Sequence, residues 1–510
     1  MSRLLYSLAW LLALPLVAAR LWWRGRKEPG YRQHWRERFG MYAGATALLP
    51  VPGRATGAER AAGAENASGS ENTAGRQQLI WLHAVSVGET RAAEPLLTAL
   101  LAAYPQASIL LTHMTPTGRE TGRTLFARHG ARVLQCYLPY DLVWLVQRFL
   151  RHFAPVACIL METEVWPNLL HACERAGVPV ALVNARLSER SMRRGQKMGR
   201  LMRDAARRIT LVAAQTQQDA QRIRALGALQ VEVTGSIKFD VAIPPAMLEL
   251  GQRLRQWIGA RPVLLCASTR EGEEALLLPE LKAMLQTSSP GHGAAASSSH
   301  APQSFAPSSP SASQSFDPSS IPASPSSLSP SALSLPLSPL LLLVPRHPQR
   351  FDEVAQMVAT HGLTMLRRST MTPESLQQGT MPSAVQVLLG DSMGEMFAYC
   401  AACDVAFIGG SLLPLGGQNL IEACALGKPV LIGPHTFNFL EVTELALTAG
   451  AAQRVADAAQ LVQATAELLN DAAKCRTMGA AALEFAVQHR GATARTLALL
   501  ARLPQLAADS

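Results

Sequence analysis

Aromatic residues are scarce in this chain: they make up only 5% of its 510 residues, too few for extensive interleaving with basic side chains. Surfaces that bind nucleic acids usually combine the two, because aromatic rings stack on bases while basic groups contact phosphates. The net charge of +10 therefore does not favour a nucleic-acid partner. Anionic lipids or phosphorylated substrates explain this charge equally well.

Cysteine is also sparse, with eight residues scattered through apolar segments. Only Cys400 and Cys403 lie close together, with neither a second pair nor a histidine nearby. A structural zinc site needs four such ligands, so we expect buried thiols and no metal site here. This cysteine usage is typical of a reducing compartment.

One long apolar run stands at the N-terminus, from Leu4 to Ala19, with Arg3 before it. Sixteen residues is at the short end for a membrane span. Many basic residues follow, which predicts that the next domain faces the cytoplasm. We therefore expect residues 1–40 to form a membrane anchor and a basic juxtamembrane segment. The basic residues after the run are Arg20, Arg24, Arg26, Lys27, Arg32, Arg36 and Arg38.

Two alternatives to a spanning helix stay open for this run. A cleaved signal peptide is one, because Val17-Ala18-Ala19 resembles a small-residue cleavage site, although the basic residues after it oppose export. An amphipathic helix in the membrane plane is the other, since Trp10, Trp22 and Trp23 suit an interface. We expect the protein to be located at a membrane.

The rest of the chain predicts an α/β protein. Residues 52–78 are rich in small and polar residues without periodicity, which indicates a flexible linker. Strand and helix patterns then alternate in two series, as in parallel, doubly wound sheets. We predict two Rossmann-like domains facing a cleft, residues 79–245 and 246–500. The predicted strands are 79–86, 108–114, 133–138, 156–162, 178–184, 209–215 and 231–235, then 263–267, 340–345, 363–367, 385–390, 404–409 and 429–433.

A Ser/Pro-rich insert interrupts the second domain at residues 287–339. It has too few apolar residues of the right pattern to form a core, so we expect disorder. Loop-closure entropy grows slowly with length, so the domain tolerates such an insert.

The stretch from Asp404 to Phe439 is the densest in motifs. A strand leads into the pairs Gly409-Gly410 and Gly416-Gly417, and Glu422 follows one turn into a helix. Glycines allow backbone N–H groups to approach a ligand, and the acid suits a ribose. A tight turn with glycines for packing is the alternative. The whole pattern favours a nucleotide-sugar site.

Three acids follow strands of the first domain. Glu89 stands next to Gly88 at the start of a helix, where a carboxylate serves either the helix dipole or general-base catalysis. Glu162 and Glu164 follow a later strand and are expected on opposite faces, one toward the site and the other capping the next helix. An acid near Glu89 would raise the pKa of that base.

Basic residues suggest anion sites in both domains. The segment from Asn184 leads into a basic helix, which is either a solvated face or a site for lipid phosphates. Lys238 lies near the domain join and suits a leaving phosphate or a sugar carboxylate. Arg346 ends a strand of the second domain and offers a guanidinium for a phosphate. Ser392 and Glu395 have the spacing of a helix capping box.

Together these motifs resemble those of the 3-deoxy-D-manno-octulosonic acid (Kdo) transferases of Gram-negative lipopolysaccharide synthesis. The resemblance runs from the anchor to about residue 490 and excludes residues 52–78 and 287–339. Two small departures are NLIE, where many members have Asn-Pro-Leu-Glu, and Gln418, where histidine is common. The motifs that carry the resemblance are WLHAVSVGET, LTHMTPTG, YLPYD, METEVWPNL, NARLSERS, TGSIKFD, STREGEE, LVPRHPQRF, GDSMGE, FIGGSLLPLGGQNLIEA and GPHTFNF.

The resemblance implies a GT-B fold, no metal or other cofactor, and a location at the cytoplasmic face of the inner membrane. It implies transfer of Kdo from CMP-Kdo to the tetraacylated lipid A precursor (lipid IVA), with inversion at the anomeric carbon. Glu89 matches the proton acceptor, and Glu162 and Lys238 match positions that stabilise the transition state. The positions that match CMP contacts are Pro345, Arg346, Met393, Gly394, Glu395, Asn419, Leu420, Ile421 and Glu422.

Two other functions stay open at this point. One is another GT-B nucleotide-sugar enzyme, such as an epimerase, which would need no anchor. The other is a non-catalytic lipid-binding relative. The sequence leaves open the number of Kdo residues transferred, the acylation of the acceptor, the oligomeric state and the role of the insert.

Overall fold

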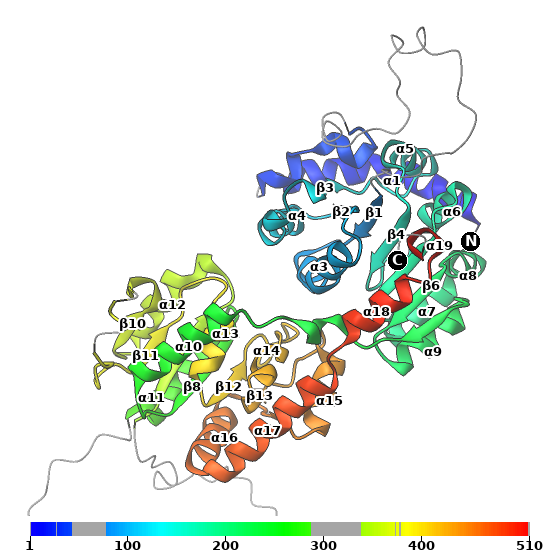
Figure 1. Ribbon diagram of the computed structural model, residues 1–510. Helices are drawn as coiled ribbons and strands as arrows, with labels where there is room; N and C mark the ends of the chain where they lie inside the picture. The colour runs from blue at the N-terminus through cyan, green and yellow to red at the C-terminus, as the bar shows by residue number, and fades with distance from the viewer. Residues whose placement is uncertain are drawn as a thin grey trace, which may run out of the picture. The chain divides into compact units, whose positions relative to one another are not determined.

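A computed structural model describes residues 2–26, 28–42, 78–286, 338–372, 374–376 and 379–507. Almost all of the predicted linker and insert lies outside these residues. The chain divides into two compact units, the first comprising residues 1–242 and 487–510 and the second residues 243–486 (Figure 1). Each is described by itself.

The first unit is built on a parallel sheet of seven strands in the order β3-β2-β1-β4-β5-β6-β7. Alternate residues of β1 enter different cores: Trp81 packs on one face with Phe149 of α5, and Leu82 on the other with Leu97 of α3. Because both faces are covered, the strands are apolar throughout rather than alternating. The strands are β1 Leu79–His83, β2 Ser108–His113, β3 Val133–Tyr137, β4 Ala157–Met161, β5 Val180–Ala185, β6 Leu211–Ala214 and β7 Val231–Val233.

Helices flank this sheet, and a long helix, α1, precedes it (Figure 1). Several helices begin with short polar side chains as caps; Thr216, for example, accepts a hydrogen bond from the backbone of Asp219 in α9. The helices are α1 Arg3–Arg24, α2 Val87–Ala92, α3 Glu94–Ala103, α4 Pro116–Leu125, α5 Val143–Phe153, α6 Pro167–Ala176, α7 Glu189–Lys197, α8 Arg200–Arg207 and α9 Gln217–Leu226, with short 3₁₀ helices η1 Pro29–Arg32, η2 Trp35–Phe39, η4 Ala127–Arg132 and η5 Ile237–Asp240.

The C-terminus of the chain returns to the first unit. Helices α18 (Ala492–Leu500) and α19 (Pro504–Ala507) place Leu500, Leu503 and Leu506 in the same core as Leu97. The sequence had suggested a second domain of 246–500, whereas the compact units divide at 242/243 and again at 486/487. Apolar spacing predicts a helix here but does not reveal which sheet the helix covers.

The second unit repeats the architecture, with strand order β10-β11-β9-β8-β12-β13-β14 and all pairs parallel. Each predicted strand is present, and β14 is an additional one. The strands are β8 Val263–Thr269, β9 Leu340–Pro345, β10 Met365–Arg367, β11 Val387–Leu389, β12 Val405–Ile408, β13 Val430–Ile432 and β14 Ala452–Arg454. The helices are α10 Pro245–Ile258, α11 Glu273–Gln286, α12 Phe351–Thr360, α13 Met396–Ala402, α14 Ile421–Ala425, α15 Leu440–Thr448, α16 Ala458–Asn470 and α17 Ala472–Gln488, with 3₁₀ helices η7 Pro348–Arg350 and η8 Arg368–Thr370.

Candidate active site

The chemistry-bearing side chains of the first unit gather at one edge of its sheet. Glu89 follows β1, Glu162 follows β4, Arg186 follows β5 and Lys238 follows β7. Carboxyl ends of parallel strands share one edge, and β1 and β4 are neighbours where the chain changes direction across the sheet. Ligands of open α/β sheets bind at such a switch point.

Glu162 is held between two cations at this edge. Lys238 Nζ lies 2.9 Å from its Oε1, and Arg186 Nε donates to its Oε2 at 3.2 Å. The side chain of Glu162 is only 10% exposed, whereas that of Arg186 is 45% exposed. The cluster therefore combines a buried, paired carboxylate with a guanidinium that is still accessible to an anion.

The backbone of Glu162 is unusual, with φ at 57° in the left-handed region. A residue with a branched or long side chain adopts this region only at an energetic cost, and such residues are common at functional sites. Its N–H donates to the carbonyl of Val183 on β5 at 3.0 Å. This bond keeps the strained residue at the end of the sheet, where its carboxylate meets both cations.

Glu89 has the protonation properties of a base that works near neutral pH. Its Oε2 accepts the Val85 N–H at 2.8 Å, and its Oε1 accepts the Ser86 hydroxyl at 3.1 Å. Burial raises the pKa of Glu89 to about 7, and the nearby charges of Glu164 and Glu162 add to that rise while the two hydrogen bonds oppose it. A carboxylate of this pKa is ionised in part at pH 7 and takes up a proton readily.

Glu164 does not cap the following helix. Its Oε2 accepts a hydrogen bond from Trp166 Nε1 at 2.6 Å, and burial raises its pKa. The start of α6 is instead capped by Asp141, which accepts the N–H groups of Asn168 at 3.0 Å and Leu169 at 2.7 Å. The suggested capping role of an acid after β4 is therefore wrong, because a residue distant in sequence occupies that place.

His83, at the end of β1, is a poor candidate for a competing base. Its Nδ1 lies 2.8 Å from the Thr112 hydroxyl, and burial lowers the pKa of the imidazole to about 3. Its ring packs edge to face against Trp166, with centroids 5.9 Å apart. We interpret it as a neutral residue that supports the loop after β4.

Two contacts position the segment that carries Lys238. Asn184 Oδ1 accepts the Ile237 N–H at 3.1 Å. Asn184 is itself buried, and its backbone lies in the left-handed region with φ at 50°. Asp240 accepts the N–H groups of Gly491 and Thr493, at 2.6 and 2.5 Å, at the start of α18. The C-terminal return of the chain thus holds η5, and with it Lys238, at the site.

Sequence reasoning had named Glu89, Glu162 and Lys238 but gave no separate role to Arg186, Asn184 or Asp141. Arg186 had been considered only as part of the segment leading to the basic helix. The position of these two residues in the sequence could have indicated a role. Asn184 lies at the end of β5 and Arg186 directly follows it, at the same sheet edge as the acids. Asp141 gave no comparable signal, because the N–H groups that it accepts begin with that of Asn168, 27 residues later.

In the second unit, the residues matched to a nucleotide follow three different strands. Pro345 ends β9, and Arg346 donates its N–H to the Thr269 carbonyl at 2.9 Å. Asn419 Nδ2 donates to Glu422 Oε1 at 3.1 Å, and Asn419 Oδ1 accepts the Ile421 N–H at 3.1 Å. The structure places Glu422 in the first turn of α14, which begins at Ile421, rather than one turn into the helix as predicted.

The third segment, Ser392 to Glu395, is organised by side chains rather than by a helix cap. Glu395 Oε2 accepts the Ser392 hydroxyl at 2.6 Å and the Tyr399 hydroxyl at 3.1 Å, while Arg368 donates to its Oε1 at 3.0 Å. Glu395 itself precedes α13. Met393 and Gly394 between these residues are exposed.

The glycine loop after β12 binds an internal carboxylate. Glu273, which is fully buried, accepts the N–H groups of Gly410 at 2.5 Å, Ser411 at 2.9 Å and Leu412 at 3.0 Å. A Cβ at Gly409 would lie 2.6 Å from Thr269 Cα, so this glycine permits close packing of two loops. At this loop the glycine therefore serves close packing, which was the alternative to a ligand site. The three backbone N–H groups already have an acceptor within the protein.

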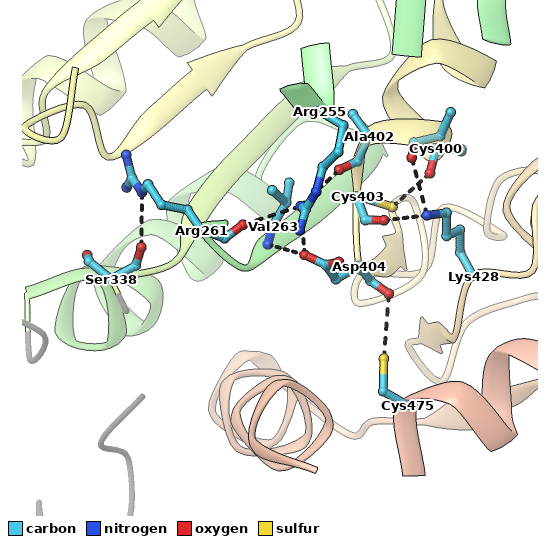
Figure 2. A network of polar contacts seen from close by, with 11 residues as sticks. Arg255, Arg261, Val263, Ser338, Cys400, Ala402, Cys403, Asp404, Lys428 and Cys475 are labelled. Carbon is cyan, nitrogen blue, oxygen red and sulfur yellow. Dashed lines mark hydrogen bonds and ion pairs between the residues drawn. The ribbon is translucent and has the colours of Figure 1, made fainter. Parts of the chain in front are cut away.

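The close cysteine pair lies in a network of polar contacts around Asp404 (Figure 2). Asp404 Oδ2 accepts hydrogen bonds from Arg255 and from the Val263 N–H, and Lys428 Nζ donates to the Cys403 carbonyl at 2.6 Å. The thiols of Cys400 and Cys403 are buried, and burial raises the pKa of both. Their surroundings are those of structural thiols at the start of β12.

Comparisons with known proteins agree on one family. A family model described as 3-deoxy-D-manno-octulosonic-acid transferase (kdotransferase) matches residues 33–241. The 3-deoxy-D-manno-octulosonic acid transferase of Bordetella pertussis is 40% identical over 502 residues, covering 98% of each chain. This chain belongs to that transferase family. It is therefore a glycosyltransferase with Kdo transferase function.

Two solved structures are similar to this chain, and the first of them supports the GT-B fold. The UDP-GlcNAc 2-epimerase of Neisseria meningitidis bound to UDP-GlcNAc has a TM-score of 0.50 at 14% identity, covering 83% of this chain and 99% of that one. The C-terminal CMP-Kdo binding domain of WaaA from Acinetobacter baumannii is 26% identical, with a TM-score of 0.35. The match covers 47% of this chain and 97% of that domain. With the two seven-stranded parallel sheets, the transferase has the predicted GT-B fold.

Proposed function

We propose that the transferase moves Kdo from CMP-Kdo to the tetraacylated lipid A precursor, with inversion and with Glu89 as general base. The observation that carries this proposal is the contrast between two neighbouring carboxylates. Glu162 is paired with Lys238 and Arg186, whereas Glu89 has no cation in its described contacts and a pKa raised to about 7. Environments that separate two acids in this way assign them different roles.

In the proposed step, a hydroxyl oxygen of the acceptor sugar forms a bond to the anomeric carbon of Kdo. Glu89 takes the hydroxyl proton, and the bond from that carbon to the CMP phosphate oxygen breaks, so that CMP leaves with the electron pair. Attack opposite the leaving group inverts the anomeric centre. General-base catalysis of this kind contributes about 10²–10⁴ in rate.

Glu162 then serves to hold cations where negative charge gathers. Lys238 is 23% exposed on its side chain and Arg186 more so, which leaves both accessible to the carboxylate of the sugar or to the leaving phosphate. Prepositioned cations stabilise the developing charge without reorganising during the reaction. We assign this role to Lys238 and, through its free guanidinium face, to Arg186.

For the donor, we propose CMP binding by Pro345, Arg346, Met393 to Glu395 and Asn419 to Glu422. These residues follow β9, β11 and β12, at the carboxyl ends where nucleotides bind in Rossmann-like units. The bond from Asn419 to Glu422 orients the acid, which suits the two hydroxyls of a ribose. Arg346 is partly exposed and suits the phosphate.

For the acceptor and location, we propose a lipid substrate reached at the cytoplasmic face of the inner membrane. One helix among the described residues, α1, is long and apolar enough to cross a membrane. Leu4, Leu12 and Leu16 on it are more than 70% exposed. An apolar surface of this kind next to many basic residues suits a bilayer with anionic lipids.

The direct test uses purified enzyme in detergent, CMP-Kdo generated in the reaction, the tetraacylated lipid A precursor, and EDTA. We expect mass spectrometry to show a product heavier by one Kdo unit, and further additions if the enzyme transfers more than one. An enzyme that binds CMP but forms no product would indicate a non-catalytic relative. Conversion of a UDP-sugar in a parallel reaction would favour the epimerase-like alternative.

A further inference from the structure

Helix α1 contacts the first unit along almost its whole length. Its partly buried residues recur every three or four positions, and the residues between them are exposed. This period is that of one helical face, so a single stripe of α1 is covered by protein. The partly buried positions are Arg3, Tyr6, Ser7, Trp10, Ala13, Leu14, Val17, Ala18 and Leu21.

The N-terminal end of α1 is attached by polar contacts. The Tyr6 hydroxyl donates to Asp141 Oδ2 at 2.9 Å, and Asn168 Nδ2 donates to the Ser7 hydroxyl at 3.0 Å. Asp141 and Asn168 are fully buried, and the Asp141 carboxylate is the one that caps α6. These contacts fix the first turns of α1 to the interior of the globular unit.

The middle and the C-terminal end of α1 are attached by apolar contacts. The rings of Trp10 and Tyr140 have centroids 5.8 Å apart. Leu14 and Leu21 pack with Trp10 against the small core around Leu145. The attachment therefore extends over several helical turns.

After α1 the chain folds back against the helix. Arg32 donates to the Trp22 carbonyl at 3.1 Å, and the Arg24 guanidinium lies 4.4 Å from the centre of the Tyr31 ring. Tyr31 is buried. Both ends of α1 are thus held by the same globular unit.

The face of α1 that points away from the unit is apolar. Its exposed residues include two tryptophans near the C-terminal end, beside exposed arginines, which is the composition of a membrane interface. Trp144, next to Leu145 on α5, is 52% exposed as well. The exposed large apolar side chains of the helix are Leu4, Leu5, Leu8, Leu11, Leu12, Leu16, Trp22 and Trp23.

We propose that α1 lies in the plane of the membrane interface, with its contact face on the globular unit and its leucine face in lipid, and does not cross the bilayer. A helix of 22 residues is about 33 Å long. If it crossed, the groups bound near both ends, including the buried carboxylate of Asp141, would have to enter the hydrocarbon or lose their contacts. Charged groups at that depth are costly, because hydrocarbon solvates them poorly.

We propose that a lipid bilayer covers the leucine face, which consists of the exposed leucines of α1 named above. This proposal rests on the membrane location proposed above but not on the reaction, and its test contains no transfer assay. An enzyme without Kdo transfer activity would leave the orientation of α1 intact, and a helix that crosses the bilayer in an active enzyme would overturn only the orientation.

The first experiment tests on which side of the membrane the N-terminus lies. A cysteine inserted between Met1 and Ser2 keeps the Ser2 cap of α1, and the native cysteines give little background because seven are buried and Cys475 is partly buried. We expect a membrane-impermeant maleimide to label it only after spheroplasts are lysed, as it does the exposed control Glu271→Cys. Labelling in intact spheroplasts would show that α1 crosses the membrane.

The second experiment measures depth with quencher lipids in anionic vesicles. A fluorophore on Leu5→Cys, Leu12→Cys or Leu16→Cys should be quenched at one shallow depth, and one on Glu271→Cys should not be quenched. A deep position for Leu12 between shallower ends would overturn the proposal. Absence of quenching at all three positions, with the protein dimeric in solution, would show that a second copy covers the face and would also overturn it.

Discussion

The ammonium group of Lys238 lies 2.9 Å from a carboxylate oxygen of Glu162, and Arg186 holds the other oxygen of the same group. Glu89 has no cationic partner of this kind in the described structure, and burial raises its pKa to about 7. This contrast, together with the roles proposed above, leads to the following expectations.

Replacing Glu89 by glutamine should remove transfer while leaving the fold intact. Glutamine keeps one oxygen, which accepts the Val85 N–H, and its NH2 group is able to donate to the Ser86 hydroxyl oxygen, but it does not take a proton from an acceptor. We expect kcat to fall by about 10²–10⁴. Product formation by mass spectrometry and thermal unfolding measure the two effects.

The matched control is Glu94→Gln, which removes a carboxylate from the neighbouring helix α3. Glu94 pairs with Arg128 at the surface, at 3.3 Å, so its loss should change neither rate nor stability appreciably. Near wild-type turnover of Glu89→Gln would contradict the assigned base.

The rate should depend on pH with an acid limb near the pKa of Glu89. The base acts when it is ionised, so kcat/KM in the free enzyme should fall as pH drops through about 7. Glu164→Gln removes a nearby negative charge that raises this pKa, so the limb should move to lower pH. A pH profile of both enzymes measures the shift; an unchanged limb would show that another group titrates.

Removing a cation from Glu162 should weaken transition-state stabilisation. We expect Lys238→Met to lower kcat by about 10²–10³, the range found when one such group is removed. Arg186→Ala should lower it less, because its guanidinium is more exposed and contacts Glu162 through Nε alone. Steady-state kinetics of both variants show which substitution lowers kcat more.

Arg193→Ala is the control for these cations, because Arg193 is exposed on α7 and, within the described structure, forms an ion pair with Glu189 and not with Glu162. It should retain wild-type kinetics. The assigned order would be wrong if Arg186→Ala were more damaging than Lys238→Met.

Glu273→Gln should destabilise the second unit. The carboxylate accepts N–H groups from Arg270 and from three successive residues of the glycine loop, and an amide would direct hydrogens toward some of these donors. We expect a loss of about 3 kcal/mol or more in unfolding free energy. Urea unfolding measures it, with the exposed neighbour Glu271→Gln as control.

Much of the fold is predictable from the sequence because buried parallel strands are short apolar runs. Strand β14, Ala452–Arg454, has no such run and is recognised only by its pairing with β13. The return of α18 to the first unit is equally hidden. Its leucines are apolar enough to pack in either unit. Only the contacts with η5 and α3 in the folded chain show that the helix belongs to the first unit.

Within the site, Glu89, Glu162 and Lys238 are recognisable because each stands at the end of a strand, where motifs of the family lie. The support for them is less visible in the sequence. Asp141 caps a helix distant in the chain, and Glu273 fills the loop whose glycines had suggested a ligand. Long-range pairing of side chains with backbone N–H groups leaves no periodic pattern in a sequence, so it becomes visible only in the folded chain.

The return of residues 487–510 to the first unit also bears on synthesis. Leu500, Leu503 and Leu506 complete a core to which strands β1, β2, β4, β5 and β6, made several hundred residues earlier, also contribute. The core of the first unit is therefore incomplete until these leucines are synthesised, whereas all residues of the second unit, 243–486, are made before them. A premature stop codon between codons 487 and 499 would remove all three leucines and so destabilise the first unit, while it would leave the second unit, residues 243–486, complete.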